Sequence, residues 1–184
     1  MVHCRSEAQA QWVWQQLDAR FRACGLELHA EKSGIVYCKD SNRRGDYASI
    51  QFTFLGFTFR PRKALNRRGQ LFTSFLPGVS REAQERMRQQ IRQWRLPRQT
   101  SSSLRAFSAQ YDTVLTGWWQ YYGSFYPTEV WKVFRYVDLT LASWSRRKYK
   151  TLRRHKHSRR WLAKVSRRDR ELFVHWRVWY GKAR

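Results

Sequence analysis

The apolar positions of the chain follow two different periods, and the change falls near Ser80. In the first part, a stripe at helical spacing follows Ser6 and Gln9, which match a capping-box pattern, and it stops at Gly25. The stripe consists of Ala10, Val13, Leu17, Phe21 and Cys24. The spacing therefore predicts one amphipathic helix between Ser6 and Gly25.

Beyond this helix the pattern becomes typical of strands. Leu26 and Leu28 alternate with polar residues, and residues 35–37 form a short β-prone run. A strand or a strand pair is therefore expected over residues 26–37.

A run of phenylalanines gives the next strand signal. Four of them lie at nearly period two, namely Phe52, Phe54, Phe57 and Phe59. Gly56 shifts their register by one residue, which indicates a strand with a bulge or a close backbone approach at the glycine.

Three apolar stripes with a helical period follow Ser80. The first ends before Pro97, and the third begins behind Pro127, where Thr128 is the expected N-cap. The stripes consist of Ala83, Met87, Ile91 and Trp94; of Leu104, Phe107, Tyr111, Val114, Leu115 and Trp118; and of Val130, Phe134, Val137, Leu141 and Trp144. A short helix is expected around Trp161 and Val165, and periodicity does not assign the apolar run behind it.

The charge of the chain is also unevenly distributed. The formal net charge is +24 over 184 residues, yet residues 1–60 carry 8 basic and 6 acidic side chains, against 29 and 7 in residues 61–184. Such a charge is too large for an ordinary soluble enzyme that acts on small neutral substrates, and a bound polyanion would relieve the self-repulsion. A hydrophobic content of 42% still allows a packed core, which argues against a disordered, charge-only chain.

The basic residues concentrate in residues 146–170, which hold 13 Lys or Arg and a single acid, Asp169. Solvated helix faces usually mix the two signs of charge, so this run favours contact with nucleic-acid phosphates. The residues expected to make these contacts are Arg146, Arg147, Lys148, Lys150, Arg153, Arg154, Arg159, Arg160, Arg167 and Arg168.

An aromatic run, GWWQYYGSFYP, starts at Gly117. Its adjacent pairs are Trp118 with Trp119 and Tyr121 with Tyr122, and four such rings cannot all face one side of a helix. Some of them must pack between elements or stay exposed, where rings can stack on bases. Both readings remain open.

The residues for catalysis are sparse. Nucleotidyl transfer by two metal ions needs clustered carboxylates, whereas Asp112, Asp138 and Asp169 stand apart in the sequence. His155 and His157 have Lys and Arg neighbours, which favours phosphate contact or solvation over metal binding. We therefore expect no catalytic residue, no metal site and no cofactor bound by this chain itself.

Several blocks of the sequence resemble, in order, the C-terminal part of group II intron reverse transcriptases, the maturases encoded within self-splicing introns. The segment Leu26–Ser33 matches LxLxxEK(S/T), and Phe54–Phe57 matches FLGF, two blocks of the palm that follow the catalytic Asp-Asp turn. The palm-motif residues are Lys32, Phe54, Leu55 and Gly56. The segments PGVSREAQERMRQQIRQW, YDTVLTGWWQYYGSFY and RRWLAKVSRR are similar to the thumb and the maturase-specific domain.

The resemblance implies an α+β fold with two domains. Residues 1–75 would be a palm remnant of one helix and two or three antiparallel strands, with an open edge and exposed apolar residues such as Phe52 and Phe54. Residues 76–184 would be a mainly helical thumb and maturase-specific domain that binds RNA. The Tyr-x-Asp-Asp block, the fingers and an endonuclease have no counterpart in the sequence, so the chain is expected to be a C-terminal fragment without polymerase activity of its own.

The partner that the resemblance implies is structured group II intron RNA, with Mg²⁺ held by that RNA or by a complete polymerase. A DNA target and a separately made N-terminal reverse-transcriptase half are further candidate partners. Two other functions stay open, a general basic RNA-binding protein and one subunit of a split polymerase. The three cysteines have no disulfide or zinc spacing, and neither a signal peptide nor a membrane span is indicated, so a cytoplasmic, RNA-associated or organellar-matrix location is expected.

Overall fold

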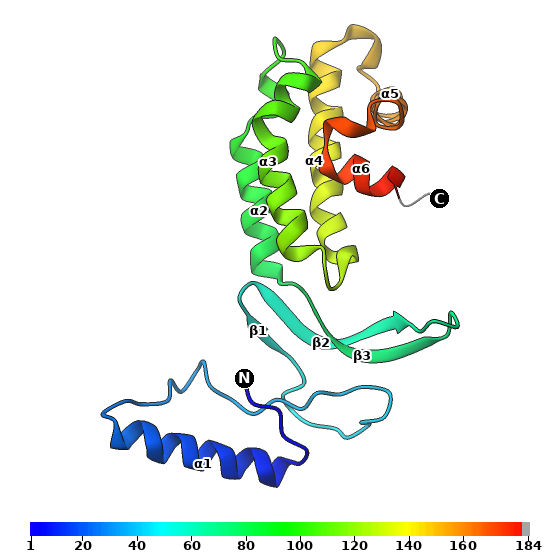
Figure 1. The fold of residues 1–184 in the computed structure, drawn as a ribbon. Helices are drawn as coiled ribbons and strands as arrows, with labels where there is room; N and C mark the ends of the chain where they lie inside the picture. Colours follow the sequence, from blue (N-terminus) through cyan, green and yellow to red (C-terminus); the bar gives the residue numbers. More distant parts are fainter. Residues whose placement is uncertain (182–184) are drawn as a thin grey trace. The chain divides into compact units, whose positions relative to one another are not determined.

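The computed structural model describes residues 1–181 and has an α+β fold, which confirms the predicted class (Figure 1). Its α-helices are α1 (Glu7–Ala23), α2 (Arg81–Gln93), α3 (Leu104–Tyr122), α4 (Pro127–Lys148), α5 (His155–Arg168) and α6 (Val174–Gly181). The strands β1 (Phe52–Phe54), β2 (Phe57–Leu65) and β3 (Leu71–Val79) form one antiparallel sheet in the order β1-β2-β3. Short 3-10 turns are η1 (Leu96–Arg98), η2 (Lys150–Leu152) and η3 (Arg170–Leu172).

The chain divides into two compact units. Unit 1 consists of Met1–Phe52 and Arg60–Phe75, and unit 2 consists of Thr53–Phe59 and the chain from Leu76 onward. The β1–β2 turn thus belongs to unit 2. The last residues of the predicted second domain, 182–184, lie outside the described part of the chain.

Unit 1 begins with the helix that the sequence predicts. The side chain of Ser6 accepts a hydrogen bond from the Gln9 N–H at 3.2 Å, and the Gln9 side chain accepts one from the Arg5 N–H at 2.8 Å. These bonds satisfy donors at the helix start, as a capping box does. The chain leaves the helix through Gly25, whose φ of 72° is readily adopted by glycine.

The prediction of a strand or strand pair over residues 26–37 is wrong. These residues form irregular backbone with one turn, and the apolar side chains of Leu26 and Ile35 remain exposed. A strand needs a neighbour that accepts and donates its ladder hydrogen bonds. The Tyr37 N–H donates to the Ser49 carbonyl at 2.9 Å, but the sheet within residues 1–181 does not include this segment.

The phenylalanine run does not form one bulged strand, so this prediction is wrong as well. Leu55 and Gly56 make a two-residue turn between β1 and β2, with φ values of 49° and 79°. Positive φ at both central residues matches the twist of a tight hairpin, which explains why the chain reverses here. The close approach that was expected at Gly56 is confirmed, since a Cβ on this residue would lie 2.7 Å from the Tyr122 hydroxyl.

Unit 2 contains the predicted helices. The side chains of Ser80 and Ser103 accept hydrogen bonds from the Ala83 and Ala106 N–H groups, so both helices begin at a serine cap. The expected N-cap at Thr128 is wrong, because α4 already begins at Pro127. Proline at the first helical position loses no helical hydrogen bond and has a suitable φ.

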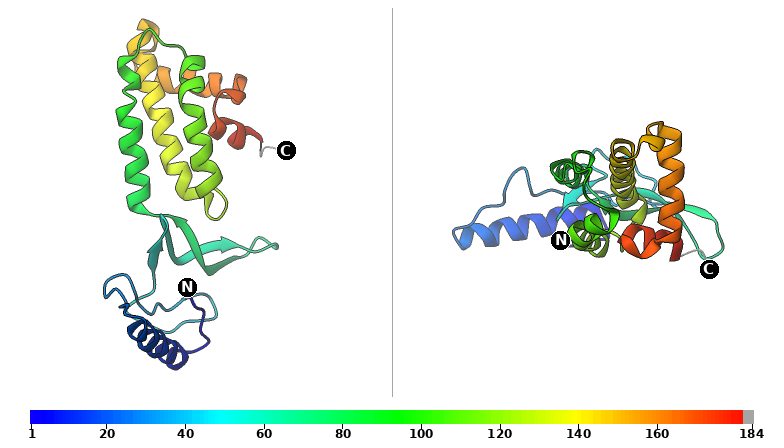
Figure 2. Two further views of the ribbon diagram at one scale, coloured as in Figure 1. Left: turned by 60° about the vertical axis from the view of Figure 1, so that its left-hand side comes forward. Right: turned by 90° about the horizontal axis from the view of Figure 1, so that it is seen from above.

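The helices α2, α3 and α4 run side by side, as two directions of view show (Figures 1 and 2). α4 also contacts α5, and α6 packs against α3. The largest buried side chains include Trp144, Phe107 and Phe134, and the Trp144 indole donates a hydrogen bond to the Gln99 carbonyl at 3.0 Å. Burial of these rings against several helices gives unit 2 a continuous core.

No helix within residues 1–181 combines the length and the hydrophobicity that a bilayer crossing requires.

Candidate nucleic-acid interface

The basic run occupies the end of α4, the turn η2, the helix α5 and the start of η3. Eight of the ten cations expected to bind phosphates are exposed, namely Arg147, Lys150, Arg153, Arg154, Arg159, Arg160, Arg167 and Arg168. The side chains of Arg146 and Lys148 are half-buried. The folded chain therefore presents most of this charge to solvent.

The two half-buried cations connect parts of unit 2. The Lys148 ammonium donates to the Ser102 carbonyl at 2.6 Å and lies 5.4 Å from the centre of the Trp144 ring. The Arg146 guanidinium contacts His155 at the start of α5 and donates to the Ser143 hydroxyl. Because these side chains already have protein partners, they contribute to the position of the α4–α5 connection.

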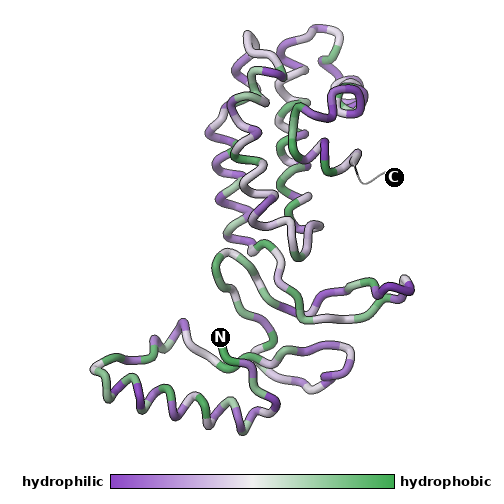
Figure 3. Tube along the Cα trace, viewed as in Figure 1, coloured by the Kyte–Doolittle hydropathy of each residue, from purple (hydrophilic) through white to green (hydrophobic). Residues whose placement is uncertain are grey.

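The helix α5 has a buried face and an opposite basic face. Its buried side chains are Ser158, Leu162, Val165 and Ser166, and most of the helix is hydrophilic (Figure 3). The cations at Lys156, Arg160, Lys164 and Arg167 are separated by four, four and three residues, so a 3.6-residue turn places them on the side away from the core. We call these four residues the α5 cation face. All four are exposed.

Two members of the α5 cation face, Lys156 and Lys164, were absent from the sequence-based set of phosphate contacts. Their spacing from Arg160 was the signal that could have identified them. Basic pairs such as Arg159 and Arg160 are adjacent in the sequence, but adjacent residues of a helix point in different directions, so they do not belong to one face.

The N-terminal end of α5 is electropositive. Arg154 occupies the N-cap without a side-chain hydrogen bond to the helix, and the first turn contains no acid. The helix dipole already places partial positive charge at this end, so the added cations are electrostatically unfavourable in the unbound protein. A nearby anion would relieve this repulsion.

Three acidic side chains of unit 2, Asp112, Asp138 and Asp169, accept hydrogen bonds from other groups of the same unit. The Asp138 carboxylate accepts hydrogen bonds from His175 at 3.1 Å and Trp176 at 2.9 Å, and Asp112 accepts from the Val174 N–H at 2.7 Å. The hydrogen bond from Arg168 lowers the pKa of the Asp169 carboxyl. These acids position α6 or the end of α5, so they leave the α5 cation face without a neutralising partner within residues 1–181.

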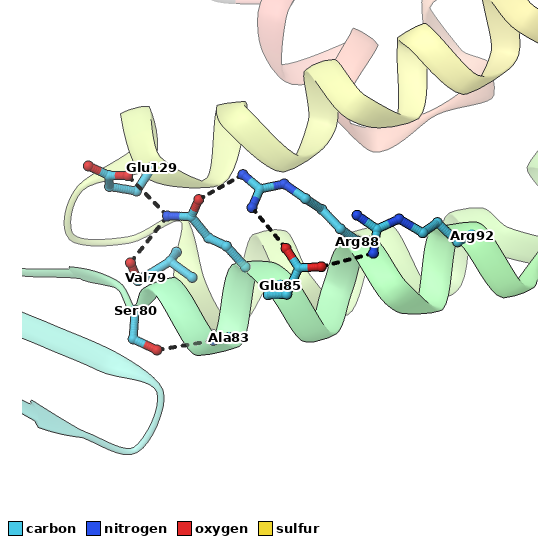
Figure 4. A network of polar contacts seen from close by, with 8 residues as sticks. Val79, Ser80, Ala83, Glu85, Arg88, Arg92 and Glu129 are labelled. Atoms are coloured by element: carbon cyan, nitrogen blue, oxygen red, sulfur yellow. Dashed lines mark hydrogen bonds and ion pairs between the residues drawn. The ribbon is translucent and has the colours of Figure 1, made fainter.

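A polar network joins the start of α2 to the start of α4 (Figure 4). The Gln84 amide donates to the Glu129 carboxylate at 3.0 Å and accepts from Arg88 at 3.1 Å. The Glu85 carboxylate pairs with Arg88 and Arg92, and the Arg92 hydrogen bond lowers the pKa of Glu85. Arg88 and Arg92 are therefore paired with acceptors of α2 itself, in contrast to the four residues of the α5 cation face.

The four rings of the adjacent pairs, Trp118, Trp119, Tyr121 and Tyr122, all have ring neighbours in unit 2. Trp118 stacks on Trp94 with an interplanar angle of 11°, and Trp119 lies 5.8 Å from Trp131. Both indoles are half-buried. This packing places the two tryptophans against the core that the helices enclose.

Tyr121 and Tyr122 contact the β1–β2 turn. The Tyr121 hydroxyl donates to the Leu55 carbonyl at 3.0 Å, and the ring of Tyr122 lies 5.1 Å from that of Phe57. Burial raises the pKa of the Tyr122 phenol. The structure thus brings the FLGF block and the aromatic run together as one packed cluster.

The remaining palm-motif residues lie at the surface. Phe54 is 49% exposed on β1, and Lys32 is exposed in unit 1, in the turn after α1. Phe52, on the same strand as Phe54, is half-buried and lies 6.1 Å from Phe75.

No group of three or more His, Cys, Asp or Glu side chains that could hold a metal ion occurs among residues 1–181. His155 has Arg146 as its neighbour, an arrangement that would repel a cation.

One family model matches much of the helical part of the chain. Residues 84–162, from α2 into α5, match the family described as the group II intron, maturase-specific domain. Searches of curated proteins and of solved structures gave no significant match. The family match supports a group II intron maturase-type region in the C-terminal part of the chain.

Proposed function

We propose that this chain binds structured group II intron RNA and assists splicing and retrohoming, as the C-terminal part of an intron-encoded reverse transcriptase without its own Asp-Asp site. The observation that carries the proposal is the coincidence of the maturase-specific match with an exposed basic surface on η2 and α5. The match includes η2 and extends into α5 as far as Leu162.

The proposed mechanism is electrostatic and conformational. Lys and Arg side chains on a fixed helix bind phosphates and release the counterions that condense on RNA. Binding to the folded RNA, and less to its unfolded forms, shifts the population toward the splicing-competent shape. Mg²⁺ bound by the RNA supplies the metal chemistry of splicing.

The ionic-strength dependence of binding tests this proposal. The native chain should bind a group II intron RNA, and its affinity should fall by about 10³-fold or more between 50 and 200 mM salt if six or more phosphates are contacted. A splicing assay at low Mg²⁺ should show faster product formation with the protein than without it. Salt-independent binding, or splicing that the protein does not change, would contradict the proposal.

A general RNA-binding protein of ribosomal type is the competing explanation. Unrelated structured RNAs would then displace the intron RNA at equal concentration. Under our proposal, a group II intron RNA should compete at least tenfold better than a ribosomal RNA fragment of similar length.

Unit 1 favours a second candidate function, that of one subunit of a split polymerase. Its helix α1 has no buried residue, and Trp12 on this helix is 60% exposed. Exposed apolar side chains on a helix that no other element buries are typical of a protein that docks with another polypeptide. Primer extension after mixing with an N-terminal reverse-transcriptase half tests the idea, and absence of nucleotide incorporation by a stable complex would remove it.

A further inference from the structure

We propose that the α5 cation face, formed by Lys156, Arg160, Lys164 and Arg167, binds the sugar-phosphate backbone of a double-helical RNA segment and does not stack on unpaired bases. This inference rests on the proposed function, and it specifies the form of RNA that this surface takes. Three properties of the helix support it: the alignment of its cations, the absence of neutralising acids, and the chemistry of its side chains.

The first property is alignment on a rigid element. The four cations lie within eleven residue steps of one helix, which correspond to a line about 16 Å long at 1.5 Å per residue. Leu162 and Val165 anchor the opposite face in the core, and α5 packs against α4. The line of charge is therefore fixed relative to unit 2, so its members can contact phosphates of one ordered backbone at the same time.

The second property is the unbalanced charge. Asp169 is the single acid among residues 146–170, and it is held by Arg168 at 2.7 Å. Arg159 and Arg168 flank the α5 cation face and are exposed as well. A nucleic-acid duplex carries about twice the charge of one strand per unit length. A straight line of cations therefore gains more favourable electrostatic energy from binding a duplex than from binding a flexible single strand.

The third property is the absence from this face of aromatic rings for stacking and of amide or carboxylate side chains for base pairing. Trp161 is the one Trp, Tyr or Phe within α5, and its ring is half-buried beside those of Trp144 and Tyr149, at 6.3 and 5.7 Å. The helix also contains no Asn, Gln, Asp or Glu, the side chains that commonly pair with adenine or cytosine edges. Proteins that bind single strands without sequence preference use exposed rings as stacking platforms, and this face has none.

The inference is tested with a variant of the full chain that carries Lys156→Gln, Arg160→Gln, Lys164→Gln and Arg167→Gln. Glutamine has good helix propensity, so α5 should still form. The matched control removes four exposed arginines from unit 1 through Arg5→Gln, Arg20→Gln, Arg67→Gln and Arg68→Gln. Circular dichroism and thermal unfolding verify that both variants remain folded.

The probes are a 20-base-pair RNA duplex of mixed sequence, a 20-nucleotide poly(U) strand and a group II intron RNA. The native chain should bind the duplex at least tenfold more tightly than poly(U). The α5 variant should lose at least 30-fold in duplex affinity. The magnitude of the slope of log K against log salt should decrease by about 3 to 4, because each of the four lost phosphate contacts contributes roughly 0.9 to that slope. The control should remain within about threefold of the native chain.

Two results would overturn the inference: native binding to poly(U) as tight as to the duplex, or equal duplex affinity of the α5 variant and the control. If the native chain binds the intron RNA and the α5 variant does so equally well, the inference fails while the proposed function stands. If the native chain prefers the duplex through α5 but does not bind the intron RNA, the proposed function fails while the surface assignment stands.

Discussion

The helices α1 of unit 1 and α4 of unit 2 have similar apolar stripes in the sequence, but they have different surroundings in the fold. Figure 3 shows hydrophobic and hydrophilic residues alternating along α1, as expected for an amphipathic helix. No residue of α1 is buried, whereas α4 buries residues along its length, including Phe134 and Trp144. A periodic stripe thus predicts the helix and its apolar face, but it does not reveal whether another element covers that face.

The difference between the units extends beyond these helices. Within residues 1–181, every fully buried apolar side chain belongs to unit 2. Unit 1 keeps Trp12, Leu26 and Ile35 at the surface. Burial of apolar area is the main favourable term in folding. We therefore expect unit 2 to remain folded alone, and we expect a bound partner to stabilise unit 1 more than unit 2.

The largest expected effect is in hydrogen exchange. Amides in the middle of α4 should be protected at least about a thousandfold more than amides in the middle of α1, because local opening of α1 exposes no buried apolar side chain. Exchange measured by mass spectrometry on the full chain gives both values in one experiment. Equal protection of the two helices would mean that α1 is buried in solution, for example in a dimer, and a dilution series would reveal this.

A pair of tryptophan substitutions tests the same contrast energetically. Trp144→Ala should lower the free energy of unfolding by about 3–5 kcal/mol, because it removes a buried ring with its hydrogen bond to Gln99. Trp12→Ala should change it by no more than about 0.5 kcal/mol, as is usual for an exposed side chain. Urea unfolding followed by circular dichroism measures both. A large loss from Trp12→Ala would contradict the proposed independence of unit 2.

Two glycines with positive φ provide a matched backbone test. Gly56→Ala should cost about 2 kcal/mol or more, because the left-handed conformation costs an L-residue about 1–2 kcal/mol and the added Cβ would also collide with the Tyr122 hydroxyl. A Cβ added at Gly69 would have no atom within 4 Å, so Gly69→Ala should cost about 1 kcal/mol from the backbone conformation alone. This destabilisation should be confined to the β2–β3 hairpin. If the two changes have equal effects on the unfolding of unit 2, the packed cluster around Gly56 does not stabilise it.

The smallest expected effect concerns the ionisation of Tyr122. Burial raises the pKa of this phenol, so its contribution to stability is fully present below the ordinary tyrosine pKa of about 10 and is lost as the pH rises through the raised value. The urea midpoint of the native chain should therefore fall more between pH 9 and pH 11 than that of Tyr122→Phe. Parallel pH dependence of the two proteins would show that the end of α3 is hydrated.

The helices could be predicted from the sequence because their signals are local. Serine caps at Ser6, Ser80 and Ser103 and apolar residues at helical spacing depend on a few neighbours in the chain. The segment 26–37 could not be predicted in the same way, because a strand exists only when another segment pairs with it. The same reason explains the turn at Leu55 and Gly56, where β1 and β2 had looked like one strand.

The candidate site follows the same division. The sequence by itself determined that residues 146–170 carry a large excess of cations and that Asp112, Asp138 and Asp169 are separate along the chain. Only the tertiary structure decided which groups have partners. Lys148 donates a hydrogen bond to the Ser102 carbonyl, Asp112 and Asp138 accept hydrogen bonds from α6, and Asp169 accepts one from Arg168. Charge is a property of composition, whereas availability of charge depends on distances between residues that are remote in the sequence.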